Sequence, residues 1–188
     1  ERQLLGSTLA DEILRLQFHS EYESVDVTNL VFTASGVNAA SHATNVDRLE
    51  LYLVGATTPF TVATVGGCGT DPVPAHSMCA TMNNQELAVP KGSNVNILVR
   101  PRMRTDVDGA VSGQAVAYYI NPAPSSVRAR GLVSSNDLDA NDGDTTPEGE
   151  VFIGVSSAGP NTGMSSKRNV VVLSKVTSLT NADPNANG

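Results

Sequence analysis

The chain has 188 residues, with 19 acidic and 12 basic side chains and a formal net charge of −7. This balance argues against nucleic acid as a partner, because nucleic-acid binding needs a basic surface. The length is enough to bury a core, and no run of about 18 apolar residues is present that would span a membrane as a helix.

The composition favours short strands joined by turns. β-Branched residues are abundant, and 16 Gly and 10 Pro accompany them, while aromatic residues make up 4% and Trp is absent. We therefore predict an all-β chain, a single antiparallel β-sandwich over residues 1–180 with long loop insertions. The polar stretch 181–188 is interpreted as a tail or linker.

The N-terminal stretch 2–18 is rich in apolar residues. One interpretation is that it forms the domain's own first strand and a covering segment. The alternative is a donor segment that completes the sheet of a neighbouring subunit by β-augmentation. Residues 4–16 also show some helical spacing, which leaves the conformation of this stretch open.

Alternation of apolar and polar residues predicts the strands, and turn clusters separate them. Within the second strand the apolar phase changes between Val27 and Leu30, which predicts a β-bulge. Glu21 and Glu23 lie in the turn before it and are interpreted as surface acids. The predicted strands are 14–18, 25–32, 46–53, 60–65, 86–89, 94–100, 114–120, 126–130, 150–155 and 169–176.

Two cysteines, Cys68 and Cys79, enclose a turn-rich decapeptide with two prolines. We interpret them as a disulfide, which indicates an oxidising compartment and so an extracellular or cell-surface location. Closing so short a loop stabilises a fold by roughly 2–3 kcal/mol. Two free thiols are the alternative.

Arginines alternate at Arg100, Arg102 and Arg104, so all three project from one face of a strand. Arg128 and Arg130 repeat the spacing. One interpretation is an outward face paired with carboxylates, in which each pair contributes little. The other is an interface with another subunit or an anionic glycan, since arginine binds carboxylates in a bidentate way.

The turn at 105–109 contains Asp106 and Asp108 before a glycine. Asp and Gly favour tight turns, so turn chemistry explains the sequence without a metal. A weak metal site is the alternative.

The segment 137–150 holds six carboxylates and no basic residue. Without them the chain has 13 acidic and 12 basic residues, so the net charge comes almost wholly from this segment. Its oxygen-bearing residues follow nearly the spacing of an EF-hand loop, although Asp142 stands where that loop needs Gly. We predict a strand-connecting Ca²⁺ loop, with a solvated acidic loop as the alternative. The predicted ligands are Asp137, Asp139, Asn141, Gly143 and Glu148, with Asp144 as a weaker candidate.

No catalytic motif is present. His19, His42 and His76 are widely spaced, and the nucleophile-elbow, zinc-protease and phosphate-loop patterns are missing. We therefore predict that the chain is not an enzyme.

Three stretches carry a resemblance to a known family, namely VDVTNLVFTASG within 24–36, VDRLELYLVG at 46–55, and LAVPKGSNVNILVRPR at 87–102. With a last strand at 169–179, they resemble the immunoglobulin-like β-sandwich modules of large secreted surface proteins of candidate-phylum bacteria. The resemblance implies an Ig-like sandwich and a cell-surface role, such as an S-layer, adhesin stalk or filament subunit.

These observations together predict a non-enzymatic structural protein of the cell surface. We expect a self-assembling subunit of an extracellular layer or filament, stabilised by the disulfide and by Ca²⁺. The alternative is an adhesive or carbohydrate-binding module of a larger secreted protein, which the lack of Trp disfavours. The expected partners are copies of the chain itself and cell-surface glycans, without nucleic acid or a membrane span.

Overall fold

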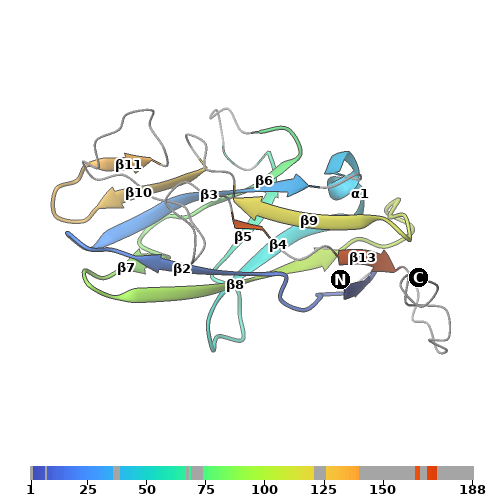
Figure 1. Cartoon of the computed structure of the whole chain (residues 1–188), viewed down its shortest axis with the longest axis horizontal. Coiled ribbons are helices and arrows are strands. Elements are labelled where there is room, and N and C mark those ends of the chain that lie inside the picture. Colours follow the sequence, from blue (N-terminus) through green and yellow to red (C-terminus); the bar gives the residue numbers. More distant parts are fainter. Residues whose placement is uncertain are drawn as a thin grey trace.

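A computed structural model describes residues 2–6, 8–35, 39–66, 68, 74–120, 126–139, 164–165 and 169–172. These residues are almost entirely β-structure (Figure 1), which confirms the all-β prediction. The helical elements are the short turn η1 (Ala39–Ser41) and the helix α1 (His42–Asn45). Among the described residues, none of the helices has the length and hydrophobicity needed to span a membrane.

Thirteen strands form the sheet. They are β1 (Arg2–Leu5), β2 (Leu14–His19), β3 (Val25–Ser35), β4 (Val46–Leu53), β5 (Thr61–Val65), β6 (Ser77–Thr81), β7 (Ala88–Val89), β8 (Asn94–Met103), β9 (Ala115–Ile120), β10 (Val127–Gly131), β11 (Asp137–Asp139), β12 (Met164–Ser165) and β13 (Asn169–Val172). Their main order is β1-β13-β9-β3-β6-β5-β4-β8-β2, while β7, β10, β11 and β12 pair outside this path. Every pair is antiparallel except β1 with β13, which is parallel.

The sheet is continuous and curled, because β5 pairs with β4 on one edge and with β6 on the other. One half, β4-β8-β2, therefore faces the other half, β9-β3-β6, across a shared interior (Figure 1). The predicted sandwich of two separate sheets is not confirmed.

A single large hydrophobic core fills the space between the two halves. Leu51 and Ile97 contribute from β4 and β8, and they are matched by Phe32 and Met78 from β3 and β6. All four side chains are fully buried. Each contributes roughly 1.5–3 kcal/mol through removal of apolar surface from water, so this core fixes which face of every strand points outward.

The predicted bulge in β3 is confirmed. On the paired strand β10, Arg128 lies opposite Asn29 and the next residue, Ala129, lies opposite Val27. Thr28 is therefore the extra residue in β3. Val27 and Leu30 are three positions apart, so a regular strand would turn them to opposite faces. The bulge lets both side chains face the core.

The N-terminal stretch belongs to the sheet of its own chain. β1 pairs with β13, and β2 pairs along β8. Between them the backbone continues beside β8, where Ala10 N–H donates to the Pro101 carbonyl at 2.9 Å and Ile13 N–H to the Val99 carbonyl at 2.9 Å. The helical spacing of residues 4–16 does not produce a helix here.

Candidate functional site

The outer face of β4 and β8 carries a set of charged side chains. Alternation along the two strands turns Leu49 and Leu51 of β4, and Val99 and Met103 of β8, into the core. The charged residues that alternate with them face outward. We call the resulting charged set the arginine face. It consists of Asp47, Arg48 and Glu50 from β4, Arg100 and Arg102 from β8, and Arg104 just beyond β8.

Glu50 lies at the centre of the arginine face, with a side chain only 4% exposed. Arg102 Nε donates to its Oε1 at 2.6 Å, Arg48 Nε donates to the same oxygen at 3.1 Å, and Tyr52 Oη donates to Oε2 at 2.5 Å. Burial raises the pKa of Glu50, but the hydrogen bonds from Arg102 and Tyr52 and the two arginine charges outweigh burial and lower it. Glu50 is therefore an anchoring carboxylate, ionised at neutral pH.

Asp47 pairs with Arg48 and with one further arginine, Arg104, at the edge of the arginine face. Arg48 Nη1 lies 2.9 Å from one carboxylate oxygen and Arg104 Nη2 lies 3.6 Å from the other. The Nε of Arg104 is buried and has no hydrogen-bond partner among the described residues. Arg104 is thus less completely paired than Arg48.

Arg100 is held in a different way, by a carbonyl and an aromatic ring. Its Nε donates to the Ala10 carbonyl at 3.0 Å, and its guanidinium carbon lies 5.6 Å from the centroid of the Tyr52 ring. That distance is within the range of a cation–π contact. Burial, followed by the hydrogen bond to Glu50, raises the pKa of Tyr52, so the phenol stays neutral and donates.

The arginine face combines four guanidiniums with two carboxylates, an excess of two positive charges on an acidic chain. The side chains of Arg48, Arg102 and Arg104 are 34–37% exposed. Their bonds to Glu50 and Asp47 hold them in place, which reduces the entropy lost when a ligand binds. The geometry suits an anion, since guanidinium donors match carboxylates bidentately.

A row of polar side chains extends the arginine face along β8 towards β2. Gln17 Nε2 donates to Asn96 Oδ1 at 3.1 Å, and a His19 ring nitrogen lies 2.9 Å from Asn94 Oδ1. Asn94 and Asn96 share the outward side of β8 with Arg100 and Arg102. The outer surface therefore grades from charged to uncharged hydrogen-bonding groups.

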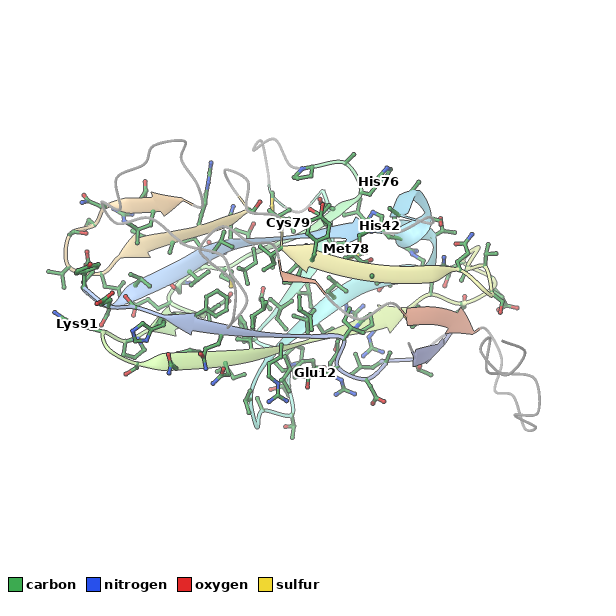
Figure 2. All side chains as sticks on the ribbon, in the orientation of Figure 1. Glu12, His42, His76, Met78, Cys79 and Lys91 are labelled. Carbon is green, nitrogen blue, oxygen red and sulfur yellow. A yellow bond between two sulfur atoms is a disulfide. The ribbon has the colours of Figure 1, made fainter. Side chains whose placement is uncertain are left out.

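A second polar group lies at the end of the core beside α1, and Figure 2 shows His42, His76 and Met78 gathered there. We call these three residues, with Tyr118, the histidine cluster. The ring nitrogen Nδ1 of His42 lies 3.2 Å from Tyr118 Oη, and the His42 and His76 ring centroids are 6.2 Å apart at an interplanar angle of 74°. Tyr118 Oη also lies 3.8 Å from Met78 Sδ.

Burial dominates the electrostatics of the histidine cluster. Burial, with a smaller contribution from the His76 charge, lowers the pKa of His42 to about 4, and burial also raises the pKa of the Tyr118 phenol. Both groups are therefore neutral at pH 7. No sequence pattern indicated this cluster, because His42 and His76 are brought together only by the fold.

The residues predicted to bind calcium are only partly within the described residues. Asp137 and Asp139 lie in β11, opposite Arg130 and Arg128 of β10 in the pairing register. Asn141, Gly143, Asp144 and Glu148 lie outside the described residues. Among the described residues, groups of three or more His, Cys, Asp or Glu that would hold a metal are absent.

The weaker metal candidates form a self-contained turn. Thr105 Oγ1 donates to Asp108 Oδ2 at 2.6 Å, and Val107 N–H donates to Asp106 Oδ1 at 3.0 Å. The Thr105 hydrogen bonds lower the pKa of Asp108. The turn follows β8 and lies at the opposite end of the sheet from the β10–β11 hairpin (Figure 1), so it does not meet the start of the acidic segment.

Glu23 has a structural role in that hairpin. Its Oε2 accepts hydrogen bonds from the backbone N–H of Val133 at 2.7 Å and of Ser134 at 3.0 Å. Hydrogen bonds from Ser134 and Val133 lower the pKa of Glu23. A Cβ at Gly131 would meet the side chains of Ser134 and Glu23, which would have to shift, so glycine allows the close approach seen here.

The cysteines Cys68 and Cys79 are joined by a disulfide, with Cα atoms 5.3 Å apart. Cys79 lies in β6, a strand that the sequence did not indicate. Four of its five residues are buried, because Met78 faces the main core while Cys79 packs with Val31 and Cys68 on the other side.

Comparisons with known proteins include a distant structural likeness. No family model and no curated protein matches the chain. A solved structure described as "AvmM Catalyzes Macrocyclization in Alchivemycin A Biosynthesis" matches with a TM-score of 0.38 and 12% sequence identity, over 95% of this chain and 86% of that one.

This match contradicts two predictions, that the chain is a structural subunit and that it is not an enzyme, because the matched protein is itself an enzyme. We therefore withdraw both. At this TM-score and identity the likeness assigns no reaction to this chain.

Proposed function

We propose that the chain binds an acidic polysaccharide on the arginine face. The observation that carries the proposal is the set of four arginines, Arg48, Arg100, Arg102 and Arg104, on one side of two adjacent strands. Alternate residues of a strand lie about 7 Å apart, so the guanidiniums form a row suited to evenly spaced anionic groups.

The neighbouring polar row supports a sugar polymer as the ligand. The amides of Gln17, Asn94 and Asn96 offer donors and acceptors for hydroxyl groups next to the charged end. A nucleic acid is disfavoured, because the arginine face, with an excess of two positive charges, is smaller than the basic surface that a phosphate backbone needs.

Binding tests show which charged group the ligand must carry. Isothermal titration with polygalacturonate, polyphosphate and uncharged dextran compares a carboxylated sugar, a phosphate polymer and a neutral sugar. We expect binding to polygalacturonate, weakened by added salt. Equal binding to dextran, or binding to polyphosphate alone, would overturn the proposal.

Variants locate the site on the surface. Arg100→Gln removes a guanidinium whose hydrogen bond goes to the Ala10 carbonyl and not to Glu50, and we expect roughly a tenfold loss of affinity for polygalacturonate. Arg130→Gln is the matched control, because Arg130 is an exposed arginine on β10, away from the arginine face. An equal loss in both variants would indicate non-specific attraction.

We also propose that the two halves of the curled sheet correspond to the two layers of an Ig-like sandwich joined through β5. The disulfide Cys68–Cys79 supports an extracellular or other oxidising location. These two proposals concern the architecture and the location of the chain, and neither depends on the identity of the ligand.

Calcium binding by the segment 137–150 is a separate proposal, supported by its six carboxylates. Titration of Ca²⁺ into the protein, monitored by calorimetry, tests it. We expect binding on the order of 10⁻⁴–10⁻³ M, lost in Glu148→Gln. Identical titrations of the variant and the wild type would overturn the assignment.

A further inference from the structure

We propose that His42 and His76 form a binding site for a first-row transition-metal ion, with Cu²⁺ as the ion bound most tightly. The site lies at the end of the core beside α1 and is distinct from the arginine face and from the acidic segment. It takes its ligands from two parts of the chain, the start of α1 and the residue before β6.

The separation of the two rings fits a shared ion. A metal–imidazole bond is about 2.0–2.1 Å long, so two imidazoles on one ion have ring centroids roughly 5–6.5 Å apart. The His42 and His76 centroids are 6.2 Å apart. Their interplanar angle of 74° is edge-on and not stacked, which is compatible with an ion that lies in the planes of both rings.

Tyr118 fixes which nitrogen of His42 is available. Its hydroxyl bonds to Nδ1, which leaves Nε2 with no hydrogen bond to any residue that the structure describes. Metal-binding histidines commonly have this arrangement, in which a partner on one ring nitrogen orients the ring and the other nitrogen binds the ion. Tyr118 is fully buried and so provides a rigid support.

His76 supplies the accessible side of the site. It is exposed, and its φ of 61° lies in the left-handed region that residues other than glycine rarely adopt. Such backbone strain is concentrated at functional positions. The Ala34 N–H donates to the His76 carbonyl at 2.8 Å, which holds the residue in this conformation.

The ligand types favour copper. Imidazole suits Cu, Zn and Ni, and affinities of divalent ions for such a site rise towards Cu²⁺ in the Irving–Williams order. Two imidazoles are too few for a structural zinc site with four protein ligands. Met78 Sδ lies 3.8 Å from Tyr118 Oη, so a thioether sulfur lies beside the hydroxyl that orients His42. No free cysteine among the described residues competes for the metal.

The three histidines of the chain provide the test. Cu²⁺ is titrated into the full chain at pH 7.5 and followed by calorimetry and electron paramagnetic resonance, in which nitrogen hyperfine structure distinguishes imidazole from carboxylate ligands. We expect one nitrogen-ligated Cu²⁺ per chain. His76→Gln, an exposed change that leaves the core intact, should weaken binding at least about tenfold and reduce the nitrogen coupling.

His19→Gln is the matched control, because His19 is exposed on β2 and lies against Asn94, away from the cluster. It should leave the affinity unchanged, whereas Tyr118→Phe should weaken binding about tenfold by releasing the His42 ring. An equal loss in His19→Gln and His76→Gln, or Cu²⁺ bound through oxygen only, would overturn the proposal.

Discussion

The arginine face and the histidine cluster both place polar side chains against the same core, but they do so in opposite ways. Around Glu50 the groups are ionised, and each charge is matched by an opposite charge or a hydrogen bond. Around His42 the groups are neutral, because burial holds the imidazole and the Tyr118 phenol in their uncharged forms.

The difference follows from position in the sheet. The arginine face lies on the outward side of central strands, where the arginine stems cover apolar surface and the guanidiniums reach water. The histidine cluster lies at the end of the interior, where water is excluded from His42 and the cost of a buried charge is highest. We therefore expect the arginine face to be destabilised by the loss of a charged partner, and the histidine cluster by a change of pH.

The largest effect should come from removing the central carboxylate. Glu50→Ala leaves Arg48 and Arg102 facing each other without their shared anion, and we expect the free energy of unfolding to fall by about 3 kcal/mol. Urea denaturation measures the change. Glu12→Ala is the control, since Glu12 pairs with Arg15 in an exposed position (labelled in Figure 2), and its loss should cost at most about 0.5 kcal/mol. Equal effects would show that the Glu50 network behaves as a surface pair.

Acid should weaken the fold next most strongly, through His42. Its folded pKa of about 4 lies below the unfolded value of 6.5, so the unfolded chain takes up the proton first. Stability is then fully present above pH 6.5 and falls as the pH drops towards 4, by roughly 2 to 3 kcal/mol in total. Denaturation between pH 7 and 4.5 in EDTA measures it.

His42→Leu gives the comparison for the acid experiment, because it removes the titrating group and keeps the site apolar. The variant should lose most of the slope between pH 6.5 and 4.5. An unchanged slope would assign the acid sensitivity to other groups. The pKa of Glu50 is lowered, so its contribution is lost only at more acidic pH and does not mask this window.

A smaller effect is expected from Tyr118→Phe, which keeps the ring and removes the hydroxyl that lies 3.2 Å from His42 Nδ1. The free energy of unfolding should fall by about 1 kcal/mol, the typical contribution of one hydrogen bond. Thermal unfolding at pH 7 measures it. A loss as large as that in Glu50→Ala would contradict the contrast between the two groups.

The smallest expected effect is the change of stability with ionic strength, which should differ between the arginine face and the histidine cluster. Salt screens exposed charges, so 1 M NaCl should lower the stability contributed by the Arg15–Glu12 pair and by the exposed part of the arginine face, by less than about 0.5 kcal/mol. The histidine cluster carries no charge at pH 7 and should not respond. Comparing the salt dependence of Glu50→Ala and His42→Leu measures the difference.

The sequence predicted the parts of the fold in which one face of a strand is apolar. The strands β4 and β8 alternate clearly and were predicted, and the phase change around Thr28 predicted the bulge. The strand β6 was missed because both of its faces are buried and its sequence does not alternate. β11 was missed because its acidic residues suggested a loop.

The candidate sites were predictable to a smaller extent. The row from Arg100 to Arg104 was visible as an alternating pattern, but Glu50 was not, since an outward-facing carboxylate normally indicates an exposed residue. Its burial depends on Arg48 of its own strand and on Arg102 of the neighbouring strand β8. His42 and His76 meet only because β3 and β6 pair and α1 closes their end, and no local pattern carries that information.

The parallel pairing of β1 with β13 has a consequence for how the chain reaches its native state. Arg2 lies opposite Asn169 in this pair, so the contact joins residues from the two extremes of the described sequence. Contacts of such sequence separation form slowly, because a very large loop must close first. During synthesis β1 emerges before β13, and the two strands cannot pair until β13 has also been made. β1, the first of the described strands in the sequence, is therefore among the last of them to be secured in the sheet.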